Sequence, residues 1–106
     1  MTREVTFINS FGAKRRCSDV GEMGKIVREL KLPGMYLITN LHEWNGYLDF
    51  SVQDDYRLEM EIWEYESDFG ILDTETAARV IKIAMTDELQ VPLKQKLSSL
   101  NIEWLT

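Results

Sequence analysis

The chain has one cysteine and two prolines among its 106 residues, and it contains no long apolar run. The single cysteine, Cys17, excludes an internal disulfide and is typical of a protein of the reducing cytosol. A membrane span needs about 20 consecutive apolar residues, which no part of the sequence provides. The first residues include Arg3 and Glu4 and lead into a strand-like run, unlike a signal peptide. We therefore expect a cytoplasmic protein with no membrane segment.

Motifs for catalysis and cofactor binding are also missing. His42 is the only histidine, and there is no Ser-His-Asp set, Cys-His pair, metal-ligand spacing or glycine-rich nucleotide fingerprint. Lys14, Arg15 and Arg16 follow Gly12, but without the G-x-x-x-x-G-K-[ST] spacing of a phosphate loop. The net charge of −6 argues against direct binding of nucleic acid, which needs clustered bases. We expect no enzymatic activity, no cofactor and no metal.

What the sequence does contain is a segment rich in acids and aromatics. Eleven of the 18 Asp and Glu residues lie between Glu43 and Glu75, where Arg57 is the only base, together with seven of the eleven Phe, Trp and Tyr residues. Like charges on neighbouring strands repel each other, so this crowding works against folding. Acids mixed with Trp and Tyr are typical of a surface that captures a basic partner.

The pattern of apolar residues predicts a single α+β domain over residues 1–106. Strands are expected at 5–9, 35–43, 47–53, 57–66 and 102–105, with a break of the fourth at 67–70. Helices are expected after Ser18 or Asp19, after Asp73 or Thr74, and from Pro92. These elements predict an antiparallel or mixed sheet of about five strands with two to three helices packed on one face.

Asn45-Gly46 is the strongest turn signal in the chain. This dipeptide favours a type I′ turn in a two-residue hairpin loop. Such a loop pairs Trp44 with Tyr47 and His42 with Asp49. Because side chains alternate along strands, it also predicts which residues of both strands face the core.

A second hairpin follows from matching apolar residues across the next turn. A three-residue loop at 54–56 pairs Phe50 with Met60, and Asp49 with Glu61, whereas a two-residue loop would break the core. The face away from the core then collects aromatic and acidic side chains, with further acids at its rim. The predicted partner-binding residues are Trp44, Tyr47, Asp49, Glu59, Glu61, Trp63 and Tyr65, with Asp54, Asp55, Glu64 and Glu66 at the rim.

Three alternatives remain open at this point. A β-bulge near Ile62 and Trp63 would bury Trp63 and Tyr65 and leave Glu64 and Glu66 outside. A row of His42, Asp49 and Glu61 across three strands would support a small metal-dependent or acid–base enzyme. The third alternative is a regulatory or adaptor domain, for example one that mimics DNA.

The basic run Lys14-Arg15-Arg16 has two interpretations. Charges on an edge strand discourage aggregation between sheets, which favours a solvated edge strand for these residues. The other interpretation is that the run pairs with the acidic face of a second copy. The sequence therefore predicts a monomer or a weak homodimer.

The acidic stretch YLDFSVQDDYRLEMEIWEYE, residues 47–66, together with the chain's size and charge, resembles the small acidic immunity proteins of bacterial contact-dependent inhibition and other polymorphic toxin systems. The likeness is one of design rather than of a matched motif. It implies an antitoxin-like inhibitor that binds one cognate toxin domain tightly. A nuclease is the expected target, because an enzyme that grips phosphate lines its cleft with Lys and Arg.

Overall fold

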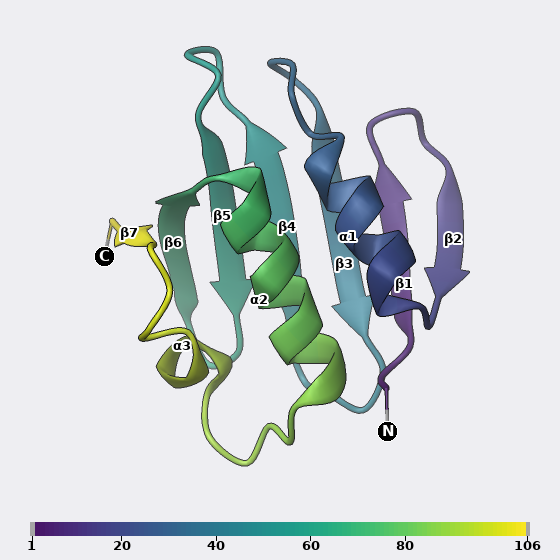
Figure 1. The fold of residues 1–106 in the computed structure, drawn as a ribbon, viewed down its shortest axis with the longest axis vertical. Helices are drawn as coiled ribbons and strands as arrows, with labels where there is room; N and C mark the ends of the chain where they lie inside the picture. The colour runs from purple at the N-terminus through teal and green to yellow at the C-terminus, as the bar shows by residue number, and fades with distance from the viewer. Residues whose placement is uncertain (1, 106) are drawn as a thin grey trace.

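The computed structural model describes residues 2–105 and places them in one antiparallel sheet with helices on one face (Figure 1). The described strands are β1 (Val5–Asn9), β2 (Lys14–Cys17), β3 (Tyr36–Leu41), β4 (Tyr47–Val52), β5 (Leu58–Trp63), β6 (Ser67–Leu72) and β7 (Glu103–Trp104). Their order across the sheet is β2-β1-β3-β4-β5-β6-β7. The α+β prediction is confirmed, with seven strands in place of the expected five or so.

Helices α1 (Val20–Arg28) and α2 (Thr74–Thr86) lie side by side over the sheet, and the short α3 (Leu93–Lys96) lies near its β6 end (Figure 1). Two residues were predicted as possible caps for each long helix, and the side chains of Asp19 and Asp73 are the ones that cap them. Asp19 accepts a hydrogen bond from the Glu22 N–H at 3.1 Å, and Asp73 accepts one from the Thr76 N–H at 2.7 Å. No helix in residues 2–105 is long and apolar enough to cross a membrane.

The core lies between the sheet and the helices. It takes alternate residues of each strand, such as Leu48, Phe50 and Met60, which are almost fully buried. The helices add apolar stripes that include Met23 on α1 and Ile81 on α2, both without exposed surface. Within residues 2–105 no helix covers the opposite face of the sheet, so the outward-pointing side chains of the central strands lie on an open surface (Figure 1).

The hairpin between β3 and β4 differs from the predicted one. Its strands are joined by residues 42–46, and the residue with positive φ is Glu43, at 61°, rather than Asn45 or Gly46. The type I′ turn is therefore wrong. Glycine is needed at position 46 for another reason: an added Cβ would lie 2.2 Å from the Trp63 carbonyl oxygen, so the two backbones meet there.

The longer loop shifts the β3–β4 register by four residues. Thr39 pairs with Leu48 instead of Val52, and Ile38 takes the predicted place of His42 opposite Asp49. Because four is an even number, no side chain changes face. The predicted core residues of both strands are therefore still buried, although their partners differ.

The β4–β5 hairpin has the predicted register. Val52 pairs with Leu58, Phe50 with Met60, and Asp49 with Glu61. Tyr56 closes the three-residue loop with φ of 69°, the left-handed position expected for a type I turn followed by a bulge. The register runs without a break to Trp63, so the alternative bulge near Ile62 is absent from this hairpin.

Residues 67–72 form strand β6, where a break was predicted. The strand β5 correspondingly ends at Trp63 instead of residue 66, and residues 64–66 form the loop between them. The missed signal is an alternation: Gly70 and Leu72 are buried, whereas Phe69 and Ile71 keep part of their surface. The basic run, by contrast, lies on the edge strand β2, as predicted.

Replacing Phe50 with alanine tests this core. Phe50 is 1% exposed, and its loss should lower the free energy of unfolding by about 3–5 kcal/mol, as large-to-small core changes do. Phe11→Ala is the matched control, because Phe11 is 84% exposed, and it should change stability by less than about 0.5 kcal/mol. Urea unfolding measures both, and equal midpoints would contradict the register described above.

Candidate functional site

The helix-free face of the sheet carries a continuous patch of aromatic and acidic side chains, here called the open-face patch. Strand alternation and pairing place its members on one surface of β3 to β6. Its residues are Tyr36, Ile38, Tyr47, Asp49, Ser51, Glu59, Glu61, Trp63 and Phe69. The patch includes five of the predicted partner-binding residues: Tyr47, Asp49, Glu59, Glu61 and Trp63.

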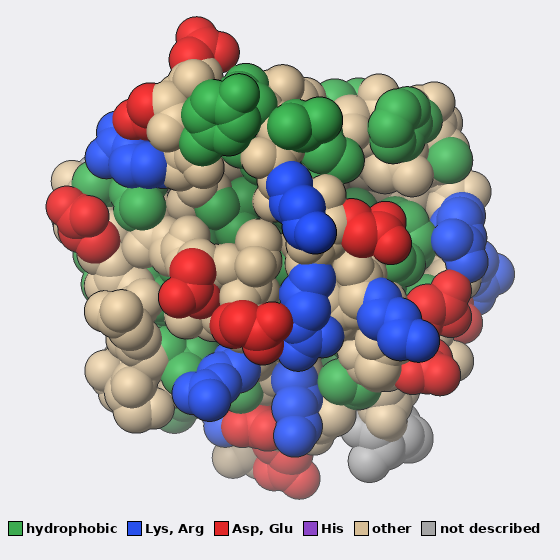
Figure 2. All heavy atoms as spheres, turned by 45° about the horizontal axis from the view of Figure 1, so that its top comes forward, with side chains coloured by type: hydrophobic (Ala, Val, Ile, Leu, Met, Phe, Trp, Pro, Cys, Tyr) green, Lys and Arg blue, Asp and Glu red, His purple; other side chains and the backbone are tan. Residues whose placement is uncertain are grey.

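The opposite, helical face has a different charge pattern. Figure 2 shows Lys and Arg side chains gathered in a column there, with acidic side chains beside them. Exposed bases of the two long helices are Lys25, Arg28, Arg79 and Lys82. One of them, Arg28, forms an ion pair with Glu75 at 2.7 Å. The helical face therefore carries both signs of charge, whereas the charged residues of the open-face patch are all acidic.

Tyr47 and Trp63 stack on each other within the patch. Their ring centroids lie 5.9 Å apart with an interplanar angle of 5°, and Trp63 is 38% exposed. The Tyr47 hydroxyl donates to Glu61 Oε2 at 3.1 Å, and the Ser67 hydroxyl donates to the same oxygen at 2.7 Å. Partial burial, then the nearby Glu61, raises the pKa of Tyr47, so the hydroxyl stays a donor. These contacts hold the rings and the Glu61 carboxylate in fixed relative positions.

Asp49 lies at the centre of the patch, between Ile38 and Glu61 in neighbouring strands. Burial first, and then the charge of Glu61, raises its pKa to about 6. Its Oδ1 atom is buried and has no hydrogen-bond partner within residues 2–105. The side chain lines a shallow hollow of about 200 Å³ that Tyr36, Ile38, Glu59 and Phe69 also border. Ionising Asp49 therefore costs more free energy than ionising an ordinary aspartate, and a nearby cation would lower that cost.

Trp44 and Glu64 do not belong to this surface, which corrects two predicted site residues. Trp44 is half-buried against the core, and its Nε1–H donates to Glu64 Oε2 at 3.2 Å. Glu64 Oε1 accepts a hydrogen bond from the Leu93 N–H at 2.6 Å. Because the β3–β4 loop is longer than predicted, it turns Trp44 inward. Glu64 thus joins this loop to α3.

The predicted position of His42, opposite Asp49, is also wrong. His42 lies beyond the end of β3, with Nε2 at 3.6 Å from Glu4 Oε1 and 3.5 Å from Thr6 Oγ1. Asp49 and Glu61 are adjacent as predicted, but Ile38 occupies the position expected for the histidine. The predicted row of His42, Asp49 and Glu61 therefore does not exist, and no group of three or more metal-ligating side chains is found among the described residues.

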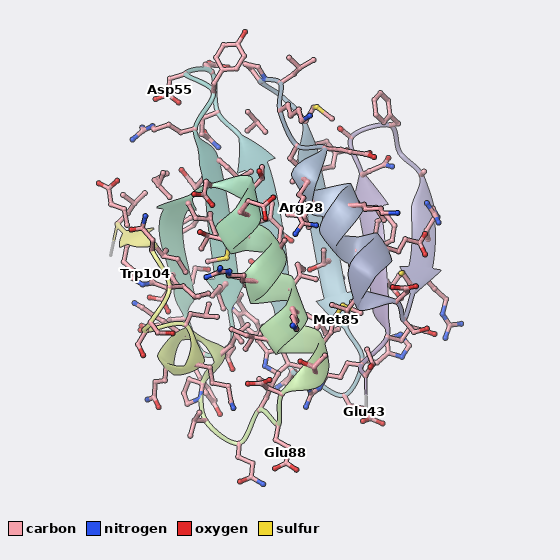
Figure 3. All side chains as sticks on the ribbon, in the orientation of Figure 1. Arg28, Glu43, Asp55, Met85, Glu88 and Trp104 are labelled. Atoms are coloured by element: carbon pink, nitrogen blue, oxygen red, sulfur yellow. The ribbon has the colours of Figure 1, made fainter. Side chains whose placement is uncertain are left out.

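The remaining predicted residues lie in loops at the two ends of the strands. Tyr65 and Glu66 are in the β5–β6 loop, where Tyr65 is 88% exposed instead of on the sheet face. Asp54 and Asp55 are exposed in the β4–β5 loop, and Figure 3 shows Asp55 at the end of the molecule opposite Glu43. The Arg57 backbone N–H and side chain hold the pKa of Asp55 below its ordinary value. A partner on the open face would approach acids from both loops.

Four patch residues were absent from the predicted set: Tyr36, Ile38, Ser51 and Phe69. Tyr36 and Ile38 alternate with the buried Leu37 and Thr39, so the predicted strand already contained the signal for them. Phe69 was missed because its segment was taken for a loop. Its pairing with Glu61 places it at the edge of the hollow that Asp49 lines.

Comparisons with known proteins give no relative: no family model, no curated protein and no solved structure matches this chain.

The unusual environment of Asp49 can be tested by Asp49→Asn. A raised pKa means that the folded state binds the Asp49 proton more tightly than the unfolded state does. The free energy of unfolding of the wild type therefore falls as pH rises from about 4 to about 6, by the amount that this proton contributed. The variant removes this loss. It should be more stable than wild type by about 1–3 kcal/mol at pH 8, and the difference should vanish below pH 4.

Denaturant unfolding of both proteins from pH 3.5 to pH 8 measures the difference directly, and pH effects of other groups cancel in it. Asp54→Asn makes the same chemical change in an exposed loop and is the matched control for the loss of one carboxyl group. A constant difference between wild type and Asp49→Asn would contradict the assigned environment.

Proposed function

We propose that this protein is an immunity-type inhibitor that binds and neutralises a cognate toxin domain through the open-face patch. The observation that carries the proposal is a set of carboxylates without cationic partners, arranged around stacked aromatic rings. The toxin domain is expected to be basic, and a nuclease is the expected class. The chain itself is not proposed to act on nucleic acid.

The three carboxylates of the patch lack the internal ion pairs that three other acids of the segment form. Other acids of the segment have partners inside the molecule: Asp68 pairs with Lys94 at 3.0 Å, Glu75 with Arg28 at 2.7 Å, and Asp55 with Arg57 at 2.7 Å. For Asp49, Glu59 and Glu61 no such ion pair is found within residues 2–105. A partner that brings Lys or Arg to this face would supply the absent counter-charge.

The aromatic residues provide the second part of a binding surface. Trp and Tyr are enriched among the residues that contribute most to protein–protein affinity, often by 2 kcal/mol or more when truncated. The Tyr47–Trp63 stack is partly exposed, and the hydrogen bond from the Tyr47 hydroxyl to Glu61 holds one of its rings. It therefore loses little conformational freedom when a partner covers it. Carboxylates around it would also accelerate encounter with a basic surface.

The target class follows from chemistry. A nuclease must bind phosphate, and it does so with clustered Lys and Arg side chains. A fixed row of carboxylates can occupy such a cleft as phosphate does. The enzyme alternative has no support from the positions of His42 and Asp49, which lie apart. An adaptor that mimics DNA uses the same surface, and the test below distinguishes it by its partner.

The test is to co-express the chain with the carboxy-terminal domain of the polypeptide encoded directly beside it. An immunity protein should restore growth to cells expressing that domain and should co-purify with it. A DNA-mimicking adaptor would bind a basic protein encoded elsewhere and would give no protection. Absence of both protection and co-purification would reject the proposal for that pair.

Glu61→Lys tests the role of the patch within such a complex. Reversing this charge should weaken binding by more than about 2 kcal/mol in isothermal titration, because it places a cation against a basic surface. The fold should persist, since Glu61 is only part-buried and its neighbour Asp49 gains a favourable charge. Glu29→Lys, at the exposed end of α1 on the helical face, is the matched control and should keep wild-type affinity. Equal affinities of the two variants would remove Glu61 from the interface.

A further inference from the structure

One row of residues crosses six of the seven strands on the open face. Direct strand pairing places six side chains next to one another in this row, one from each of β2, β1, β3, β4, β5 and β6. In that order they are Lys14, Ile8, Ile38, Asp49, Glu61 and Phe69. The row therefore begins with a cation, passes through two isoleucines and reaches two carboxylates.

The positions two strands from Ile38 on either side of the row carry opposite charges. Lys14 lies two strands from Ile38 on one side, and Glu61 lies two strands from it on the other. We propose that the open face forms a face-to-face homodimer with a second copy of this chain. The two-fold axis runs parallel to the strands and passes over Ile38. It places Lys14 of each copy over Glu61 of the other.

The contacts made by this arrangement satisfy groups that are unsatisfied in the single chain. Ile38 is 37% exposed and would meet its own counterpart at the axis. For Lys14, no ion pair is found within residues 2–105. Sheets packed face to face lie about 10 Å apart, a gap that extended Lys and Glu side chains bridge together. The incoming ammonium would also lie near Asp49, whose charge is otherwise uncompensated.

The area available makes this dimer weak. The overlap involves five neighbouring strands, in the order β2, β1, β3, β4 and β5. It covers roughly 400 Å² per copy. A total of roughly 800 Å² lies below the 1,200–2,000 Å² of stable complexes. The dimer is therefore expected to dissociate on dilution, which leaves the face accessible at low concentration.

This proposal does not depend on the proposed function, because the second copy is its only partner. If both hold, they involve the same face, and a toxin domain must displace the second copy. The two can fail separately: Lys14 lies on β2, outside the open-face patch, so it is required for the dimer and is not required for toxin binding.

A charge exchange tests the dimer by sedimentation velocity across a concentration series. Lys14→Glu and Glu61→Lys should each weaken self-association at least 10-fold, since each places like charges opposite one another. An equimolar mixture of the two variants should associate as wild type does, because both symmetry-related contacts are then of opposite sign. Salt dependence is less informative, since each copy carries a net charge of −6 and salt also screens that repulsion.

Two further variants complete the test. Ile38→Glu places two carboxylates at the axis and should abolish the dimer, while circular dichroism reports an intact fold. Lys82→Glu makes the same charge change as Lys14→Glu on the exposed face of α2 and should leave self-association unchanged. The proposal is overturned if the wild-type chain stays monomeric up to millimolar concentration, or if the mixed variants fail to associate.

Discussion

The antiparallel pairing of β4 with β5 is the constraint on which both faces of this protein depend. One register places Leu48, Phe50 and Val52 against Ile62, Met60 and Leu58 in the core. The same register places Asp49 beside Glu61 on the other side of the sheet. Burial of the apolar face stabilises the pairing, and the repulsion between the two carboxylates opposes it. The core thus holds together a surface that would not assemble by itself.

The faces of the strands could be predicted more reliably than their partners. Side chains alternate with a period of two, so any error of an even number of residues preserves which side is buried. The β3–β4 register was wrong by four, yet Leu41 and Thr39 are buried as expected. The dipeptide Asn45-Gly46 misled because glycine has two uses. It permits positive φ, and it also permits close backbone approach, and the sequence does not distinguish them.

Charge counts were a poorer guide to the surface than strand alternation. Eleven acids in one segment suggested a single acidic plate, but the fold uses several of them internally. Asp73 caps α2, Asp68 pairs with Lys94, and Glu64 receives hydrogen bonds from Trp44 and Leu93. Which carboxylates remain uncompensated depends on loops and on helix positions, neither of which a pattern along the chain encodes. Tyr65 illustrates the same limit. It was predicted on the sheet face, but β5 ends at Trp63, so Tyr65 lies in the following loop.

The close approach at Gly46 restricts this position in a way that does not apply to the outward residues of the sheet. Any side chain there would collide with the Trp63 carbonyl and push apart the strand ends that carry Tyr47 and Trp63. Outward residues such as Ile38, Glu59 and Phe69 have no such restriction, because changing them leaves the core untouched. A lineage could therefore diversify the character of this surface rapidly, one outward residue at a time, while inheriting the frame beneath it unaltered.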